Sequence, residues 1–269
     1  MHLHQGWARP DQPGSCIPTS MAPMNEWWRE YGEYHQRSRE IDLLDQQAEA
    51  EAEAVWKLLR LTPGAVILDA PCGFGRHAVR LAAWGFSVLG IDLDEFLLEE
   101  AKSRAQASGV SLQLQQGDLR SLPVEDNTVD AVLNLATSIG LFADDRENMA
   151  VLREAHRVLR PGGKFLIETM HRDMTTIMPE NAWEIRPDDT IILKQGQFDI
   201  VSGQLHSKLT VVAPDGTRSE FSRHQQIYSL TKLVETLQEA GFCEVHCYGG
   251  LGEIPPTPHE KAVLVAEKS

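Results

Sequence analysis

The sequence predicts an α/β protein in which a parallel β-sheet is covered by helices on both faces. Two observations carry this prediction. From about residue 64 to residue 170, short apolar runs alternate with amphipathic helical segments, which is the pattern of parallel strands joined by crossover helices. From residue 171 to residue 228 only β-runs are visible, which indicates an antiparallel β insertion in the α/β order.

The chain begins with segments that we expect to lie outside the sheet. Residues 1–24 contain several prolines and lack the apolar run of a signal peptide, so we expect a disordered tail. Helical spacing of apolar residues predicts two helices, over 25–36 and 42–60, and the second stops before a Pro-Gly pair. Residues 25–63 therefore form a predicted N-terminal helical cap.

The alternating part of the sequence covers residues 64–170. Helices are expected over 75–84, 95–108 and 145–159. Strands are expected over 66–70, 86–91, 111–115, 129–135 and 164–169, the last entered through a turn at Pro161, Gly162 and Gly163.

Residues 171–228 form the predicted insertion, which we expect to contact substrate and which is a candidate surface for a homodimer. Three β-runs are expected over 190–228, with the hairpin turn APDG at Ala213–Gly216. The α/β pattern resumes over 229–269, with a helix at 230–240 and strands at 242–247 and 262–266. Cys243 and Cys247 are expected to be buried thiols on one face of the first of these strands.

Composition limits the function classes. Hydrophobic residues make up 42% and charged residues 24%, which is ordinary for a soluble globular protein. The net charge of −14 argues against a nucleic-acid partner, because binding a phosphate backbone needs a concentrated basic surface. No run approaches membrane-spanning length, and the four cysteines suit neither a disulfide framework nor a zinc site. We therefore expect a cytoplasmic protein without a bound metal or membrane partner.

The stretch LDAPCGFGRHAVRLA, residues 68–82, contains the main functional motif. Its first strand ends in Asp69, and Gly73, Gly75 and Ala78 fit the pattern GxGxxA. Glycine lets the backbone approach a ligand closely, and the N–H groups at the start of the next helix suit an anionic group. The pattern alone is weak, because dinucleotide-binding proteins also use it.

Acids at three successive strand ends distinguish between the possible ligands. Asp69 would repel a pyrophosphate, but it suits a ligand with an ammonium or sulfonium charge. Asp92 ends the second strand and can accept hydrogen bonds from both ribose hydroxyls. Asp118 follows the third strand, where a carboxylate can accept the exocyclic amine of adenine. This order of groups fits S-adenosylmethionine.

Five segments resemble the successive motifs of class I S-adenosylmethionine-dependent methyltransferases, above all those of bacterial small-molecule enzymes such as the sugar N,N-dimethyltransferases. They are VILDAPCGFGRHAVRLA, VLGIDLD, GDLRSLP, VDAVLNLATSIGLF and VLRPGGKFLIE. The resemblance is specific over about 64–170 and looser over 25–63 and 230–269. It implies a Rossmann-like sheet of seven strands that ends in a reversed hairpin. Pro71 departs from the commonest loop, which has glycine, and is compatible where a positive φ is not needed.

The resemblance also implies a binding role for each residue that matches a motif. The first loop would line the methionine end, the second and third loops the ribose and adenine, and the fourth the underside of the sulfonium. The implied cofactor-binding residues are Asp69, Ala70, Pro71, Cys72, Gly73, Gly75, Asp92, Leu93, Asp118, Leu119, Asn134 and Leu135.

The catalytic group is harder to identify from the sequence. Methyl transfer is an in-line displacement, so positioning and exclusion of water can supply most of the acceleration, and a base is needed only when the nucleophile arrives protonated. His171, just past the strand at 164–169, is the expected base, and Tyr31 on the first helix is the second candidate. The remaining candidates are His206, His224, Tyr34 and His35, whereas His77 is expected to pack on the helix start.

The reading that fits best is a methyltransferase that moves a methyl group to N or O of a small-molecule acceptor. A non-catalytic S-adenosylmethionine-binding protein and a protein-modifying enzyme stay open as alternatives, and an NAD(P)-dependent oxidoreductase fits less well. The sequence NLAT stands after the fourth strand, where nucleic-acid methyltransferases would have NPPY or DPPY. The acceptor molecule and its acceptor atom stay open.

Overall fold

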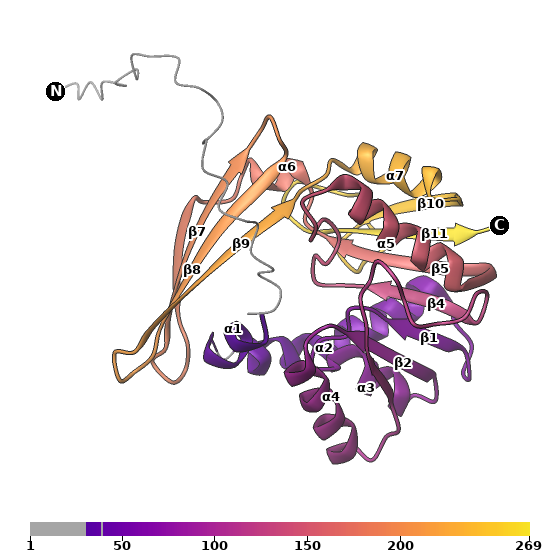
Figure 1. Cartoon of the computed structure of the whole chain (residues 1–269), viewed down its shortest axis with the longest axis horizontal. Helices are drawn as coiled ribbons and strands as arrows, with labels where there is room; N and C mark the ends of the chain where they lie inside the picture. The colour runs from indigo at the N-terminus through magenta and orange to yellow at the C-terminus, as the bar shows by residue number, and fades with distance from the viewer. Residues whose placement is uncertain (1–30, 39) are drawn as a thin grey trace.

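The computed structural model describes residues 31–38 and 40–269 (Figure 1). Its helices are α1 (Tyr31–Ser38), α2 (Glu40–Leu59), α3 (Arg76–Ala83), α4 (Glu95–Ala107), α5 (Asp145–Val158), α6 (Arg172–Thr175) and α7 (Leu230–Glu239). Its strands are β1 (Val66–Asp69), β2 (Ser87–Asp92), β3 (Gln113–Gln116), β4 (Val129–Asn134), β5 (Leu159–Thr169), β6 (Asn181–Ile185), β7 (Ile191–Asp199), β8 (Gln204–Val212), β9 (Arg218–Gln226), β10 (Phe242–Gly249) and β11 (Ala262–Lys268).

Seven strands form one sheet in the order β10-β11-β5-β4-β1-β2-β3. The pairs from β5 to β3 are parallel, whereas β11 runs antiparallel to both β5 and β10. Apolar residues of α2 and α3 cover one face of this sheet, and those of α5 and α7 cover the other. The predicted Rossmann-like sheet with a reversed final hairpin is therefore confirmed.

The central strand β1 shows why the sequence builds this sheet. Its residues Ile67 and Leu68 are fully buried, one in each of the two core clusters, as expected for a parallel strand with helices on both faces. Parallel pairing places Asp69, the last residue of β1, beside Gly90 of β2 and Leu133 of β4. The carboxyl ends of these strands, and the loops that follow them, therefore meet at one edge of the sheet.

A second sheet, in the antiparallel order β6-β7-β8-β9, stands to one side of the first sheet (Figure 1). One face packs on α1, where Tyr34 joins Ile192, Val211 and Phe221 in a small apolar cluster. The N-terminal helix and the insertion, which are far apart in the sequence, thus share a core.

The three β-runs predicted over 190–228 are confirmed as β7, β8 and β9, but the insertion has a fourth strand, β6, before them. The hairpin turn over 213–216 is confirmed, because the Gly216 N–H donates to the Ala213 carbonyl at 2.9 Å. The sequence missed β6, an edge strand of only five residues. Its two large apolar side chains, Trp183 and Ile185, are 69% and 56% exposed, so β6 lacks the buried alternation that marks a strand.

Two local predictions near the end of the sheet need correction. Cys243 is exposed because a register shift between Phe242 and Glu244 breaks the regular alternation of β10 at this residue, and Cys247 is only half-buried. The turn at 161–163 lies within β5, whose pairing with β4 skips from Leu159 to Lys164.

The N-terminal predictions are tested only in part. The helix expected over 25–36 is seen as α1, whose described part starts at Tyr31, while the tail 1–24 lies outside the described residues. In residues 31–38 and 40–269, no helix combines the length and the apolar character that crossing a membrane requires.

Candidate active site

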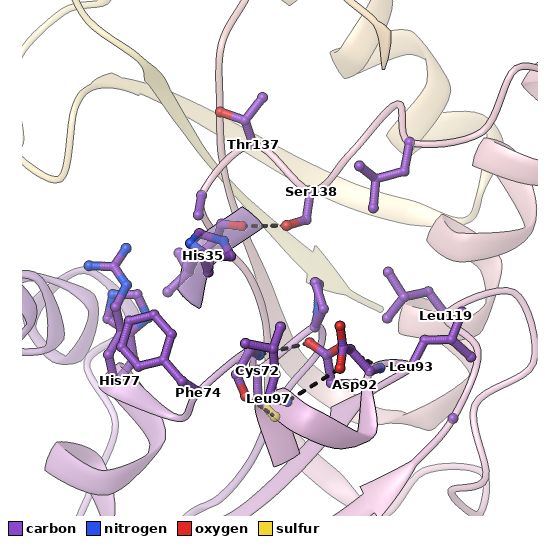
Figure 2. Close-up of a pocket in the computed structure, with 18 of the residues that line it drawn as sticks. His35, Cys72, Phe74, His77, Asp92, Leu93, Leu97, Leu119, Thr137 and Ser138 are labelled. Carbon is purple, nitrogen blue, oxygen red and sulfur yellow. Dashed lines mark hydrogen bonds between the residues drawn. The ribbon is translucent and has the colours of Figure 1, made fainter. Parts of the chain in front are cut away.

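The carboxyl ends of β1, β2, β3 and β4 border one large cavity (Figure 2). It holds about 1110 Å³ of empty space, part of which is open to solvent. Residues of α1, α2 and β9 complete the wall opposite the strand ends.

Asp92, the last residue of β2, is held at the cavity wall by the backbone. Its Oδ2 accepts the Gly73 N–H at 2.8 Å, and its Oδ1 accepts the Asp94 N–H at 3.0 Å. Burial raises the pKa of Asp92 to about 6, although these hydrogen bonds counteract the rise. Each carboxylate oxygen has a second lone pair, so the group can also accept from two neighbouring hydroxyls.

Gly73 and Gly75 have different parts in the loop between β1 and α3. Gly73 lines the cavity with φ +53°, and a Cβ at this position would meet no protein atom within 4 Å. Gly75 has φ +73°, and a Cβ there would lie 2.9 Å from the Cβ of Ala101 on α4. Gly73 therefore keeps space for a ligand, whereas Gly75 lets α3 start close to α4.

Asp69 lies behind this loop, outside the cavity lining. It is 1% exposed, and neither carboxylate oxygen has a hydrogen-bond partner among the described residues. Burial raises the pKa of Asp69 to about 7, the charge of Arg76 counteracts the rise, and the charge of Asp92 adds to it. Two acids that burial leaves poorly compensated make this end of the cavity favourable to a cation.

The wall next to β2 and β3 is apolar apart from one group of charged side chains. Leu93 and Leu119 line it (Figure 2). Asp118 also lines it, but its carboxylate accepts from the Arg120 Nε at 3.0 and 3.1 Å and from Nη2 at 2.5 Å, which lowers the pKa of Asp118. Arg120, which the sequence motifs do not single out, pairs with Glu147 as well. The Arg120 guanidinium therefore takes up hydrogen-bonding positions of the Asp118 carboxylate, which was expected to meet adenine.

The loop after β4 has an unusual backbone where it borders the cavity. Ala136 and Thr137 both have left-handed conformations, with φ of 58° and 62°. Such conformations cost energy outside glycine and persist only when the surroundings hold them. The side-chain amide of Asn134, which lies behind the lining, donates to the Ala70 carbonyl at 3.0 Å and ties this strand end to β1.

Groups from β5 and β9 hold this loop from two sides. Glu168 of β5 accepts the Ala136 N–H on its Oε2 at 2.8 Å and the Thr137 N–H on its backbone carbonyl at 2.9 Å. From β9, the amide of the buried Gln225 donates to the carbonyls of Thr137 and Ile139 at 2.7 and 2.9 Å. The insertion and the seven-stranded sheet therefore fix the loop together.

The wall opposite the strand ends contains His35 of α1 and Arg223 of β9. The His35 ring lies 6.4 Å from the ring of Phe74 in the glycine loop, measured between centroids, and faces the cavity beside Ser138 (Figure 2). Sequence reasoning named His35 only among several alternative bases and missed Arg223. The signal was available, because the spacing of Phe221, Arg223 and Gln225 places them on one face of a strand.

His77 also borders the cavity, on the first turn of α3. As expected, it packs at the helix start, where its Nε2 lies 2.9 Å from Glu51 Oε2 of α2. Burial lowers the pKa of His77. The same carboxylate pairs with Arg76, so α2 and α3 are joined by a buried charged cluster below the cavity.

The structure brings most of the predicted cofactor-binding residues to one wall and leaves the rest directly behind it. The predicted residues that line the cavity are Pro71, Cys72, Gly73, Asp92, Leu93, Asp118, Leu119 and Leu135. Those that lie outside the lining are Asp69, Ala70, Gly75 and Asn134.

Of the two proposed catalytic residues, the structure places only the His171 side chain. His171 is 2% exposed and lies outside the cavity lining, with its Nε2 3.1 Å from the Thr257 carbonyl. Tyr31 begins α1, but its side chain is not among those described. The imidazoles of His206 and His224 pair with each other at 2.6 Å between Nδ1 atoms, outside this cavity.

Comparisons with known proteins agree with this site. A family model described as "Methyltransferase domain" matches residues 67–163. An uncharacterized methyltransferase of Synechocystis sp., sll0829, is 31% identical over 164 residues, which cover 55% of this chain and 74% of that protein. The chain belongs to the class I S-adenosylmethionine-dependent methyltransferases. Their cofactor, and therefore that of this chain, is S-adenosylmethionine.

Solved methyltransferases share the fold of this chain. An S-adenosylmethionine-dependent methyltransferase from Clostridium acetobutylicum has a TM-score of 0.74 at 12% identity, covering 90% of this chain and 99% of that one. The sugar N-methyltransferase KedS8 from Streptoalloteichus sp. has a TM-score of 0.68 at 19% identity, covering 85% and 92%.

The residues of this methyltransferase fit the cofactor. The space beside Gly73 that a Cβ would fill admits a ligand close to the loop backbone. The unpartnered carboxylate of Asp69 and the poorly compensated one of Asp92 suit a ligand with a sulfonium and an ammonium group. Leu93 and Leu119 offer apolar surface for a flat base.

Proposed function

We propose that this chain is an enzyme that moves a methyl group from S-adenosylmethionine to N or O of a small-molecule acceptor. The observation that carries the proposal is one continuous cavity with two unlike walls. Strand-end loops with acids and leucines form one wall, and α1 with β9 forms the other. A cavity lined by two such walls can bring a cofactor and a small acceptor into contact, as group transfer requires.

Six of the predicted cofactor-binding residues have a proposed role in this enzyme. The carboxylate of Asp92 would accept the two ribose hydroxyls, and Leu93 with Leu119 would enclose the adenine. Asp118 would meet the adenine amine by exchanging one of its hydrogen bonds from Arg120 for one from the base. Gly73 would border the methionine end, with the charge of Asp69 acting from behind the loop.

S-adenosylmethionine, when bound, supplies an activated methyl carbon for in-line displacement. The chain then has to orient the acceptor and exclude water, which can account for most of the acceleration. Thr137 and Ser138, on the loop that β5 and β9 hold, are placed to orient an acceptor beside the β4 end. His35 is the imidazole that lines the opposite wall, and it is better placed to receive a proton than His171.

A small-molecule acceptor is favoured over nucleic acid and protein for two reasons. The net charge of −14 disfavours a phosphate backbone. Residues of α1 and β9 line the acceptor end together with the loop after β4, as expected for a site that encloses a small acceptor. The structural neighbour KedS8, a sugar N-methyltransferase by name, agrees with this choice.

Calorimetric titration of the full chain with S-adenosylmethionine tests the proposal. Asp92→Ala removes two charge-assisted hydrogen bonds, each worth about 1.5–3 kcal/mol, and water that enters returns part of this loss, so we expect affinity to fall about 10- to 1000-fold. Asp92→Asn keeps the shape and should bind with intermediate affinity. Circular dichroism would show that both variants fold.

Unchanged affinity in Asp92→Ala would contradict the ribose assignment. Binding of NADH without binding of S-adenosylhomocysteine would contradict the proposed function as a whole. If the cofactor binds and no methyl transfer to any small amine or alcohol occurs across a broad acceptor panel, the non-catalytic alternative gains support.

A further inference from the structure

The carboxylate of Asp94 joins two helices that are far apart in the sequence. Its Oδ1 caps α4 by accepting the Phe96 N–H at 2.9 Å and the Leu97 N–H at 3.4 Å. Its Oδ2 accepts the N–H of Gly32 in α1 at 3.0 Å. Because one rigid carboxylate serves both helices, the start of α4 fixes the place of α1.

Gly32 fits this contact closely. A Cβ at this position would collide with the Asp94 Oδ2 atom. Asp94 could make room for it only by giving up its contact with Gly32 or its cap on α4. Glycine is a poorer helix former than alanine by roughly fivefold per residue, so the close approach of Asp94, and not helix propensity, accounts for a glycine here.

Asp94 is also tied to the cofactor end of the cavity. Its backbone N–H donates to the Asp92 Oδ1 atom at 3.0 Å, and both aspartates line the cavity. The proposed function assigns the Asp92 carboxylate to the two ribose hydroxyls. A bound ribose would therefore reduce the freedom of the turn from Asp92 to Asp94, and with it the freedom of the carboxylate that holds Gly32.

Helix α1 in turn carries part of the acceptor wall. His35 lies one helical turn after Gly32, on the same side of α1, and faces the cavity (Figure 2). At the far end of α1 the insertion provides a second anchor, because the Arg186 Nε donates to the Ser38 carbonyl at 3.0 Å. Asp94 therefore holds one end of α1 and the insertion holds the other, with His35 between them.

We propose that Asp94 is a positioning residue that seats α1 over the acceptor end when the cofactor is bound. This inference rests on the proposed function, from which it takes the ribose site. Two hydrogen bonds, from Asp94 to Asp92 and from Gly32 to Asp94, connect that site with the helix that carries His35. Coupling of this kind is reciprocal, so the cofactor stabilises the seated helix and the seated helix strengthens cofactor binding by the same factor.

Hydrogen exchange of the α1 amides in the full chain, with and without saturating S-adenosylhomocysteine, tests the inference. In wild type we expect the ligand to slow this exchange at least about fivefold, the lower end of typical coupling between two sites. Asp94→Asn keeps the size of the side chain and a cap for α4, but its single carbonyl oxygen cannot serve both helices. Without ligand, exchange in α1 should then be at least about 10-fold faster, and the ligand should no longer slow it.

Gly32→Ala breaks the same contact from the other side. Alanine favours a helix, so a purely local effect would slow exchange in α1, whereas loss of the contact should speed it. Asp144→Asn is the matched control, because Asp144 caps α5 through the Arg146 N–H at 2.9 Å. This control removes the same charge from the N-cap of a different helix, and exchange in α1 and its response to the ligand should not change.

Two results of the exchange experiment would overturn the inference. In the first, S-adenosylhomocysteine does not slow exchange in α1 of the wild-type chain. In the second, it slows this exchange equally in wild type, Asp94→Asn and Gly32→Ala. Either result would mean that the contact only stabilises α1 and does not respond to the cofactor.

Calorimetry with S-adenosylhomocysteine separates positioning from direct contact with the cofactor, because Asp94 also lines the cavity. Gly32 lies outside the lining, so positioning predicts similar losses of affinity in Asp94→Asn and Gly32→Ala, no larger than the factor by which the ligand slows exchange. A loss about 10-fold larger in Asp94→Asn would assign Asp94 to the cofactor itself and overturn the inference. Failure of the wild-type chain to bind S-adenosylhomocysteine would contradict the proposed function instead.

Discussion

The two ends of the cavity are assembled from very different parts of the chain. At the cofactor end, the wall comes from the loops after β1, β2 and β3, which lie between residues 69 and 119. At the acceptor end, the wall comes from α1, the loop after β4 and β9, and its polar members include His35, Thr137, Ser138 and Arg223. The first end is local in sequence and acidic, whereas the second joins three distant segments and carries an arginine.

The two ends therefore depend on different parts of the fold. Loops that follow neighbouring parallel strands meet at one edge of the sheet whenever the sheet forms, so the cofactor end depends on the core alone. The acceptor end depends in addition on the contact of the insertion with α1 and with the β4 loop. Changes at the first end should therefore alter cofactor affinity, and changes at the second should alter acceptor binding and local stability.

The largest effects are expected from valine at the two glycines of the first loop. Gly73→Val would strain a left-handed residue and fill the space beside it, so S-adenosylmethionine affinity should fall more than about 100-fold with a stability loss of only about 1–3 kcal/mol. Gly75→Val would collide with Ala101 and should lower the free energy of unfolding by about 3 kcal/mol or more. Calorimetry measures the affinity and urea denaturation measures the stability. Similar losses of affinity and stability in both variants would contradict the different roles assigned to Gly73 and Gly75.

A smaller effect is expected at the joint between the insertion and the β4 loop. Gln225→Leu would leave the carbonyls of Thr137 and Ile139 without their donor, and each unsatisfied buried group costs about 1–3 kcal/mol. We expect urea denaturation to show a loss of this size and cofactor affinity to change less than about threefold. Gln226→Leu is the control, because the Gln226 amide bonds to Ser202 at an exposed site and its loss should cost under about 0.5 kcal/mol.

The pH dependence of cofactor affinity should reflect the two buried acids. Burial holds the pKa of Asp69 at about 7 and that of Asp92 at about 6. Both carboxyls are therefore largely protonated at about pH 5.5, although this pH is about two units above the pKa of an ordinary aspartate. A cationic ligand favours their ionised forms. Affinity for S-adenosylmethionine should therefore rise by about tenfold from about pH 5.5 to about pH 8.

The same acids should make the ligand-free protein less stable as the pH rises. A carboxyl whose pKa is raised by folding binds its proton more tightly in the folded state, so stability is lost between the unfolded value of 3.8 and the folded value of about 7 for Asp69. Thermal unfolding across this range checks the sign. If cofactor affinity does not change with pH in wild type or in Asp92→Asn, the two acids do not contribute to cofactor binding.

The smallest effect is expected for His171→Ala. His171 lies outside the cavity lining and bonds to Thr257, so the variant should keep turnover within about threefold and lose about 1 kcal/mol of stability, the worth of one hydrogen bond. The matched variant His35→Ala should lower turnover more, because His35 lines the acceptor wall. A hundredfold loss in His171→Ala that recovers at high pH would restore His171 as the general base.

The sequence predicts the cofactor end well because its signals are local. The strand, the glycines and the acids that follow β1, β2 and β3 are close in sequence, and the parallel sheet fixes their relative places. His171 was predicted to lie near the site only because it follows β5 in the sequence. It could not show that the backbone enters α6 and turns the imidazole toward Thr257.

The acceptor end was not predictable in the same way. The place of Arg223 in the cavity wall depends on which face of β9 meets the cavity, and that in turn depends on tertiary contacts of Phe221 and Gln225. Likewise, a single register shift in β10 leaves Cys243 exposed. Strand β6 was not predicted because it is a short edge strand without a buried face. Each miss comes from packing between distant segments and not from local propensity.

The loop after β4, with its two left-handed residues held by Glu168 and Gln225, has a consequence for protein engineering. A grafted insertion from a relative would arrive with its own residue at the Gln225 position, and the recipient loop would lose its donor. Chimeras that exchange residues 181–226 alone should therefore fold poorly, whereas those that exchange the β4 loop with them should not. The insertion and the loop after β4, to which it hydrogen-bonds, should therefore be exchanged together.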